Sequence, residues 1–320
     1  MDDAALALLE LGRLLKGAGY AFTTVTPETH RRVNQRASSI GCELAGNLRD
    51  VFGWNRPFDP ELLPSEMLDA LHDADLIGRD GGQPRSRVRF ASLGAQLFAH
   101  SAFPTTASDA VFFGPDSYRF CALVERWAGR ARRLVDVGCG SGVGGISAAR
   151  HGQERVLADV NERALWFAQV NAALNATEVS VVTSDVLSAI DGPIDLVIAN
   201  PPYMRDPARR MYRDGGGSHG EALAVRIVHE ALARLEPDGE LILYTGSAIS
   251  DGRDGFLDAV MPVLQAAGRP FDYEELDPDV FGEELDQPGY AHVERIAAVG
   301  LRVGRDLLRA QRTKRPNAAQ

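Results

Sequence analysis

The sequence has little cysteine, and its cysteines form no recognisable metal or disulfide pattern. Cys42, Cys121 and Cys139 are widely spaced, and there is neither a Cys-x-x-Cys pair nor a histidine pair at metal-ligand spacing. A disulfide framework and a zinc site are therefore not expected, and no other metal is predicted. A reducing compartment fits this cysteine usage.

A long apolar run and a basic N-terminus are also missing. The chain begins Met1-Asp2-Asp3, which is acidic where a signal peptide would be basic, and no apolar segment reaches membrane-spanning length. We therefore expect a soluble, cytoplasmic protein that does not enter a membrane.

Positive charge is in short supply as well. Lysine and arginine together number 34 against 44 aspartates and glutamates, which gives a net charge of −10 and an isoelectric point near 5.2. Such a surface is not expected to bind nucleic acid over its whole area. A polyanionic partner would need a local basic patch.

The composition is that of a globular protein, and the chain has two parts with different sequence patterns. The boundary between them lies near Ala107. Residues 1–106 carry helical periodicity at 4–15, 28–36, 41–51 and 61–73, followed by alternating strands at 86–91 and 95–99. This order predicts a small, mainly helical, winged-helix-like domain for substrate recognition or dimerisation. Arg85, Arg87 and Arg89 on the hairpin could contact a polyanion, although a solvated strand face explains them more simply.

Residues 107–304 alternate short apolar strands with helices. Strands are predicted at 133–137, 155–159, 179–183, 194–199 and 240–245, and two more at 271–276 and 292–303 would close the sheet as a hairpin. The fold class is therefore α/β: a seven-stranded, Rossmann-like sheet with helices on both faces. Residues 305–320 are basic, and we expect a flexible tail.

Acidic residues lie within, at the end of and just after the first three strands of this unit, and a glycine loop follows the first strand. The loop, residues 138–145, is not a Walker loop because no Gly-Lys-Ser/Thr follows, and Asp136 in the preceding strand would repel a pyrophosphate. Asp136 could instead accept from an ammonium group. Asp159 could accept from ribose hydroxyls, and Asp185 from an adenine amino group. A nucleoside that carries an amino acid and no phosphate satisfies all three acids.

The fourth strand ends in Asn200-Pro201-Pro202-Tyr203. Two successive prolines cannot donate to a sheet, so the strand must stop there. A turn after a strand is one interpretation. The other is a set of free acceptors, the Asn200 carboxamide and the Pro201 carbonyl, that orients a planar NH2 group while Tyr203 stacks on its face.

These motifs resemble class I S-adenosylmethionine-dependent methyltransferases over about residues 112–303. The last motif is similar to the Asn-Pro-Pro-Tyr motif of the HemK-like, "small domain" group, which methylates planar nitrogen. The resemblance implies S-adenosylmethionine as cofactor and Asn200, Pro201, Pro202 and Tyr203 as catalytic residues. It implies a cofactor site made of the residues Asp136, Gly138, Gly140, Ser141, Gly142, Asp159, Val160, Asp185, Val186 and Asn200.

The resemblance leaves the substrate open. HemK-like enzymes carry Pro-Arg-Pro where this chain has residues 113–117, Phe-Gly-Pro-Asp-Ser. A protein glutamine is the first expectation and an exocyclic amine in rRNA or DNA the second. A small biosynthetic molecule with a dimerising N-terminal domain is an alternative, and a non-catalytic regulator that senses the cofactor is a remote one. The predicted substrate-binding residues are Phe113, Tyr118, Arg205, Arg209 and Arg213.

Overall fold

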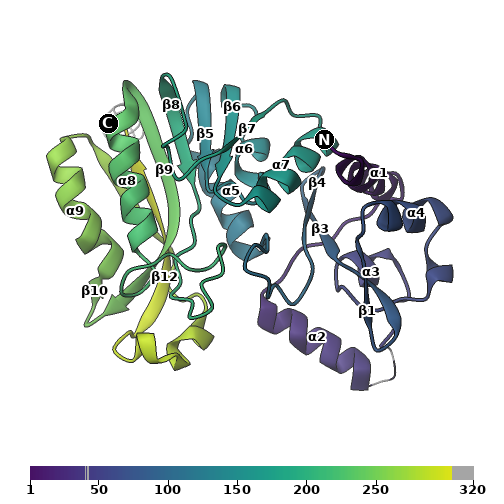
Figure 1. The fold of residues 1–320 in the computed structure, drawn as a ribbon. Coiled ribbons are helices and arrows are strands. Elements are labelled where there is room, and N and C mark those ends of the chain that lie inside the picture. The colour runs from purple at the N-terminus through teal and green to yellow at the C-terminus, as the bar shows by residue number, and fades with distance from the viewer. Residues whose placement is uncertain (40, 42, 305–320) are drawn as a thin grey trace, which may run out of the picture.

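The computed structural model describes residues 1–39, 41 and 43–304, and a single mixed sheet runs through its centre. The strand order is β11-β12-β9-β8-β5-β6-β7, with the two-residue β10 (Arg253–Asp254) paired to β9. Figure 1 labels every strand of this order except β11. The seven strands of this path are β5 (Ala131–Val137), β6 (Gly152–Asp159), β7 (Ser180–Thr183), β8 (Ile194–Ala199), β9 (Leu235–Ser250), β11 (Phe271–Asp277) and β12 (Arg295–Val303). The predicted seven-stranded α/β sheet is confirmed.

Strand direction follows the prediction too. The pairs β5·β6, β6·β7, β5·β8 and β8·β9 are parallel, whereas β12 is antiparallel to both β9 and β11. The last two strands therefore form the expected closing hairpin. Because β5, β6, β7 and β8 all run the same way, their carboxyl ends meet at one edge of the sheet.

Helices cover both faces because alternate strand residues point to opposite sides. Val135 and Val137 of β5 pack with helices α8 (Ala222–Arg234) and α9 (Gly255–Ala267). Leu134, on the other side of the same strand, packs with α5 (Pro115–Trp127). Two more helices lie between the sheet and the N-terminal elements, α6 (Val143–Ser147) and α7 (Glu162–Leu174).

The N-terminal residues form helices and two hairpins, of which one helix and one strand pack against α7. The helices are α1 (Asp3–Gly17), α2 (Pro27–Ser39), α3 (Leu48–Phe52) and α4 (Ser65–Asp73); the strands are β1 (Ile77–Asp80), β2 (Gln83–Ser86), β3 (Val88–Leu93) and β4 (Gln96–Ser101). The amide of Asn171 on α7 accepts from Ala99 N at 2.7 Å and donates to Ala99 O at 2.9 Å, and Asn175 bonds Leu97 in the same way. The side-chain amides of Asn171 in α7 and of Asn175, which caps its end, thus pair with the edge of β4.

Two predicted helices differ from the structure. The helix expected over 41–51 is limited to α3, because the Asn47 side chain caps its start by accepting from the amides of Arg49 and Asp50. The helix expected over 61–73 begins only at Ser65, because Pro64 separates it from a short 3-10 turn. The division at residue 107 and the winged-helix likeness stay predictions, and the tail 305–320 lies outside the described residues.

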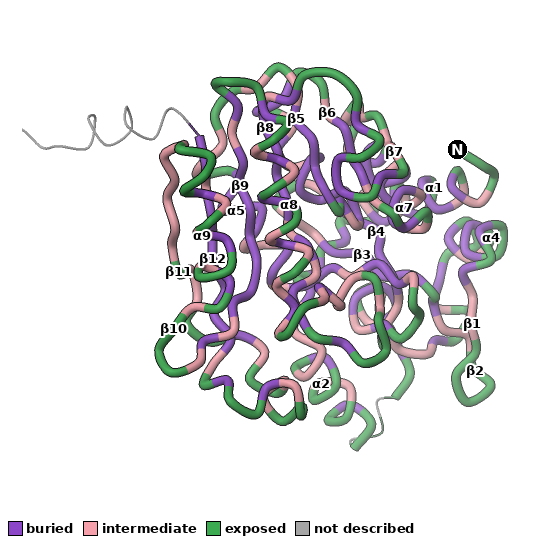
Figure 2. Tube along the Cα trace, turned by 60° about the vertical axis from the view of Figure 1, so that its left-hand side comes forward, coloured by how far each residue is buried: buried purple, intermediate pink, exposed green. Residues whose placement is uncertain are grey.

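The idea of three exposed arginines on one hairpin face is wrong for Arg89. Its side chain is only 3% exposed and donates to Ser101 O at 3.3 Å, with its Nη1 lying 3.4 Å from His30 Nδ1. Burial first, and the Arg89 charge second, lower the pKa of His30 to about 3. Figure 2 shows how much of β3 and β4 is buried.

Candidate active site

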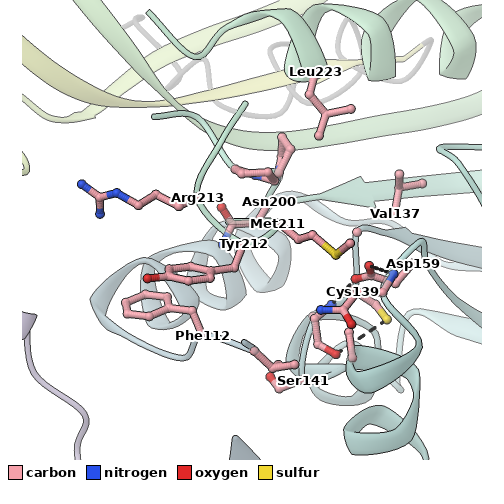
Figure 3. A pocket seen from close by; sticks show the side chains of 18 of the residues that line it. Phe112, Val137, Cys139, Ser141, Asp159, Asn200, Met211, Tyr212, Arg213 and Leu223 are labelled. Carbon is pink, nitrogen blue, oxygen red and sulfur yellow. Dashed lines mark hydrogen bonds between the residues drawn. The ribbon is translucent and has the colours of Figure 1, made fainter. Parts of the chain in front are cut away.

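A pocket opens at the carboxyl ends of the parallel strands, where most of the predicted site residues come together (Figure 3). The glycine loop after β5, Asp159 after β6, the loop after β7 and the segment after β8 all line it. Of the predicted residues, those that line the pocket are Asp136, Gly138, Gly140, Ser141, Asp159, Val160, Asp185, Val186, Asn200, Pro201, Pro202, Tyr203 and Arg213. Gly142 lies just behind the loop, with its backbone at φ 77° as the first turn of α6 begins.

The glycine loop is held by bonds within the chain. Gly138 and Gly140 have φ of 67° and 54°, a left-handed conformation that favours glycine. The amides of Gly138 and Cys139 both donate to Ala158 O, and Gly140 N donates to Asp159 Oδ2 at 2.9 Å. A phosphate would need such amides as donors, and here they are already used. The loop therefore suits a ligand without phosphate.

Asp136 is a buried carboxyl at the base of the pocket. It is 1% exposed, and its Oδ2 accepts from Gly145 N at 2.7 Å. Burial, with a smaller contribution from Asp159, raises the pKa of Asp136 to about 7. A Cβ added at Gly144 would lie 2.8 Å from this oxygen, so glycine is needed for the helix to approach the carboxyl.

Asp159 is fixed in the same manner at the end of β6. Its Oδ2 accepts from Gly140 N and its Oδ1 from Asn161 N at 2.9 Å, while burial raises its pKa. Each carboxylate oxygen can accept a further hydrogen bond, so the side chain can still bind two hydroxyls. Val160, the next residue, is 51% exposed and lies at the pocket wall.

Asp185 differs from the other two acids because a protein side chain already binds it. Both of its oxygens accept from the Arg226 guanidinium, each at 2.9 Å. Val186 follows with φ 53°, a strained conformation for a β-branched residue, and its buried side chain lines the pocket. The contact of Asp185 with an adenine amino group stays a prediction. Such a contact would use the lone pairs of the carboxylate that Arg226 leaves free.

Asn200 follows the last residue of β8 and faces the pocket from the sheet edge. It is half-buried, and among the residues that the structure describes its carboxamide makes no hydrogen bond. Pro201 and Pro202, which carry no N–H, also line the pocket. The Asn200 carboxamide oxygen and the Pro201 carbonyl thus lie without partners among the described residues. They lie where the glycine loop and the ends of β5, β6 and β8 converge.

The Tyr203 side chain is held in place by a hydrogen bond from its hydroxyl. Its hydroxyl donates to Asp116 Oδ2 at 2.5 Å, and the Tyr244 hydroxyl donates to Asp116 Oδ1 at 2.7 Å. Arg119 bonds the same carboxylate at 3.1 Å. Tyr203 is 8% exposed, and a Cβ on Gly246 would lie 2.2 Å from its ring. Asp116 therefore fixes the position of the ring, a role that sequence reasoning did not assign.

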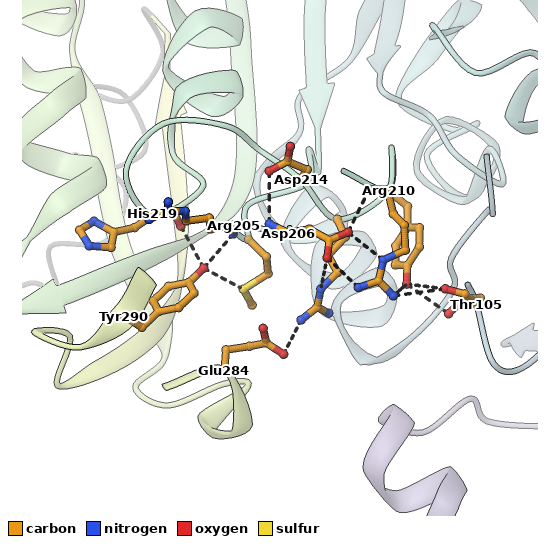
Figure 4. Close-up of polar contacts among 11 residues, drawn as sticks. Thr105, Arg205, Asp206, Arg210, Asp214, His219, Glu284 and Tyr290 are labelled. Atoms are coloured by element: carbon orange, nitrogen blue, oxygen red, sulfur yellow. Dashed lines mark hydrogen bonds and ion pairs between the residues drawn. The ribbon is translucent and has the colours of Figure 1, made fainter. Parts of the chain in front are cut away.

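The loop after Tyr203 folds back on the glycine segment 215–220 (Figure 4). Met204 N donates to Arg213 O, and Gly215 N donates to Met204 O at 2.9 Å. Cβ atoms on Gly215 and Gly220 would come within 2.4 Å of the backbone of Pro202 and Tyr203. The Tyr290 hydroxyl then accepts from Arg205 N at 2.9 Å. Close backbone packing thus sets the direction of the Asn-Pro-Pro-Tyr segment.

Most of the predicted arginine cluster does not face the pocket. Arg213 lines it but pairs with Glu284, and Arg210 forms a two-pronged ion pair with Asp206. Arg205 and Arg209 do not line the pocket; they are exposed, and in the described part of the chain neither forms an ion pair. Their proposed contact with substrate stays a prediction.

Aromatic residues at the entrance were missed. Phe112 and Tyr212 stack with ring centroids 5.5 Å apart and an angle of 13°, and Met211 beside them is 49% exposed. The predicted residues Phe113 and Tyr118 lie deeper: Phe113 is fully buried and stacks on His100, and the Tyr118 hydroxyl accepts from Thr24 N. The run of aromatic residues from 112 to 118 was the right signal, but it did not say which ring faces the pocket.

Comparisons with known proteins place the chain among methyltransferases. The family model described as Methyltransferase small domain matches residues 121–251. A release factor glutamine methyltransferase from Koribacter versatilis is 32% identical over 57% of this chain and 69% of its own length. One from Deinococcus radiodurans is 32% identical over 48% of this chain and 55% of its own length.

Other similar proteins carry different names. The ribosomal RNA small subunit methyltransferase C of Actinobacillus succinogenes is 38% identical over 34% of this chain and 30% of its own length. The chain thus spans about half, or less, of the length of most curated relatives it matches. The structure of Trm5b from Pyrococcus abyssi aligns with a TM-score of 0.48 and 15% identity, over 71% of this chain and 62% of that one.

Proposed function

The chain belongs to the HemK-like class I S-adenosylmethionine-dependent methyltransferases, and from this premise we propose that it methylates a planar NH2 nitrogen. The observation that carries the proposal is the Asn200 carboxamide, half-buried in the pocket and without a partner among the described residues. A group whose hydrogen bonds are not used within the protein is available to a ligand.

The pocket fits the cofactor by the chemistry of its side chains. Four aspartates, Asp116, Asp136, Asp159 and Asp185, line it against one arginine, Arg213, within the described residues. Such a lining suits a cationic nucleoside without phosphate. Asp159 would hold the ribose hydroxyls, Asp136 the ammonium side of the amino acid, and Val160 and Val186 the adenine faces. When bound, S-adenosylmethionine supplies a methyl group on a positively charged sulfur.

The residues of the chain then need only to hold and orient the acceptor. The Asn200 oxygen and the Pro201 carbonyl can accept both hydrogens of an NH2 group and keep them in one plane. This orientation places the nitrogen lone pair perpendicular to that plane. It also stabilises positive charge that develops on the nitrogen. Alignment of this kind can account for roughly 7 to 11 kcal/mol of a barrier.

Tyr203 contributes a fixed apolar surface beside the acceptor. Because Asp116 accepts from its hydroxyl, the ring cannot swing out of the pocket wall. Both a glutamine carboxamide and an exocyclic amine of a nucleobase present a planar NH2 group, so the acceptor atom is the same for the two substrates.

Substitution of Asn200 tests the proposal. We expect Asn200→Ala to abolish methyl transfer while the dissociation constant for S-adenosylmethionine, measured by calorimetry, changes little. Transfer is followed with labelled cofactor and a cell extract separated into protein, RNA and small-molecule fractions. Gln265→Ala, which removes an exposed carboxamide on α9, is the matched control and should transfer normally. A wild-type rate in Asn200→Ala would show that the assignment is wrong.

A further inference from the structure

A groove on the N-terminal side of the molecule is lined by arginines. It lies between the β1–β2 hairpin, the segment 101–110 and the start of α7. Arg79, Arg85, Arg87 and Arg163 line it, and within the described residues no aspartate or glutamate does. A concentration of four guanidinium groups is notable in a protein whose net charge is −10.

Arg85 is held in a fixed position at the centre of the groove. Its Nε donates to Asn55 O at 2.7 Å and its Nη2 to Phe103 O at 3.0 Å, while Nη1 pairs with Asp80 at 2.9 Å. Backbone carbonyls carry no net charge, so two of these bonds orient the guanidinium without neutralising it. A pre-positioned arginine loses little conformational freedom when it binds an anion.

The acids that pair with the other groove arginines are exposed. Arg87 pairs with Asp75 at 3.2 Å, and the Asp75 side chain is 91% exposed. Arg163 pairs with Asp109, 46% exposed, at 3.5 Å, and Arg79 makes no ion pair among the described residues. Exposed pairs contribute about 0 to 1 kcal/mol, so an incoming anion can replace these acids at low cost.

The groove and the entrance of the catalytic pocket share a wall. Ala110 lines both cavities. Thr105 lines the groove, and its carbonyl accepts from the hydroxyl of Tyr212 at 2.9 Å, a contact that lies among those drawn in Figure 4. Tyr212 in turn stacks on Phe112 at the pocket entrance. A ligand long enough to pass over this shared wall can contact the arginines and enter the pocket.

We infer that this groove binds phosphodiester groups of a polynucleotide whose base enters the pocket. The inference rests on the proposed function, because it names the molecule that carries the planar NH2 group. Arginine forks match phosphate oxygens, and the stacked rings of Phe112 and Tyr212 offer aromatic surface to a base that has left its helix. An acidic peptide would use the arginines but would have no need of stacked rings at the entrance.

The test measures polynucleotide binding separately from methyl transfer. The probe is a labelled 20-nucleotide single-stranded RNA of mixed sequence, and the same sequence as DNA shows which backbone is preferred; anisotropy gives the dissociation constant. The test variant is Arg79→Ala with Arg87→Ala. The control is Arg13→Ala with Arg253→Ala, which removes two exposed arginines that line neither cavity.

The test variant should bind the RNA at least about tenfold more weakly at 0.1 M salt, with a salt dependence about 1.4 lower in slope, because two phosphate contacts are lost. The control should bind as the wild type does. Equal weakening in both variants, or no RNA and DNA binding by the wild-type chain, would overturn the inference. Binding of a glutamate-rich peptide in place of RNA, lost in the test variant, would overturn it in favour of a protein partner.

The outcome is independent of the catalytic assignment. In the Asn200→Ala background, RNA binding should still depend on Arg79 and Arg87, because Asn200 lies outside the groove. If no candidate is methylated while RNA binding depends on Arg79 and Arg87, the proposed function fails and the groove stands. If methyl transfer depends on Asn200 but RNA binding does not depend on the arginines, the groove assignment fails alone.

Discussion

The catalytic pocket and the neighbouring groove have opposite charge, and they hold their charges in different ways. The pocket is lined by four aspartates, of which Asp116 and Asp136 are buried and Asp159 is largely so. The groove is lined by four arginines, and two of them, Arg79 and Arg87, are exposed. Ala110 lines both cavities.

The difference indicates two kinds of binding. Backbone amides donate to Asp136 and Asp159, so these carboxylates are in place before a ligand arrives. The groove arginines are paired with exposed acids or not at all, which suits weak contacts repeated along a polymer. Under the two proposals, a fixed site for a small cofactor lies beside an adaptable one for a large substrate, and substitutions should affect one without the other.

Among the substitutions that should affect one cavity and not the other, Asp159→Ala is expected to have the largest effect. It removes the acceptor of Gly140 N and Asn161 N together with the predicted ribose contact. The two hydrogen bonds from the ribose hydroxyls to the charged carboxylate contribute about 3 kcal/mol in total. Their loss should weaken cofactor binding about a hundredfold by calorimetry. RNA binding at the groove should not change. Parallel losses in both assays would mean that the two cavities are not independent.

The strand-end residues of the pocket could be predicted from sequence, because parallel strands all end at one edge of their sheet. Asp136 lies one residue before the end of its apolar strand, Asp159 ends its strand and Asn200 directly follows one, so their meeting required only the strand order. Asp116 is different. It lies at the start of α5, and its partner hydroxyls come from residues 203 and 244, which no local pattern connects to it.

The groove could be predicted only in part, through Arg85 and Arg87, for a related reason. Alternation over residues 85, 87 and 89 suggested one continuous strand face, but Arg87 lies between β2, which ends at Ser86, and β3, which starts at Val88. The direction of the side chains changes at that break, and Arg89 turns inward. Arg79 and Arg163 join the groove from a neighbouring strand and from α7. A sequence pattern shows which residues share a face of one helix or strand, whereas the groove is formed by residues from several separate segments.

A smaller effect within the pocket alone is expected from Asp116→Asn. The asparagine amide has only one oxygen and no charge, so it cannot accept from both tyrosine hydroxyls as the carboxylate does. Tyr203 should therefore lose its fixed position. We expect kcat to fall about tenfold, equivalent to about 1.4 kcal/mol, with little change in the KM for the cofactor.

Tyr244→Phe is the matched control for this position. It removes one donor to Asp116 but leaves the bond with Tyr203 in place, so kcat should fall less than in Asp116→Asn. Thermal unfolding of both variants separates positioning from stability. If the two variants lose kcat equally, or if KM for the cofactor rises instead, Asp116 does not act through Tyr203.

The smallest effect should have the opposite sign. Asp75 is exposed and pairs with Arg87, so Asp75→Asn would leave that arginine free for phosphate. Asp75 has φ 51°, a conformation that asparagine tolerates, and the fold should not change. RNA binding should tighten about twofold, the scale of a surface ion pair. Asp258→Asn, which frees Arg253 outside both cavities, removes the same charge and should leave binding unchanged. Equal tightening in the two variants would mean that overall charge, and not the groove, attracts the RNA.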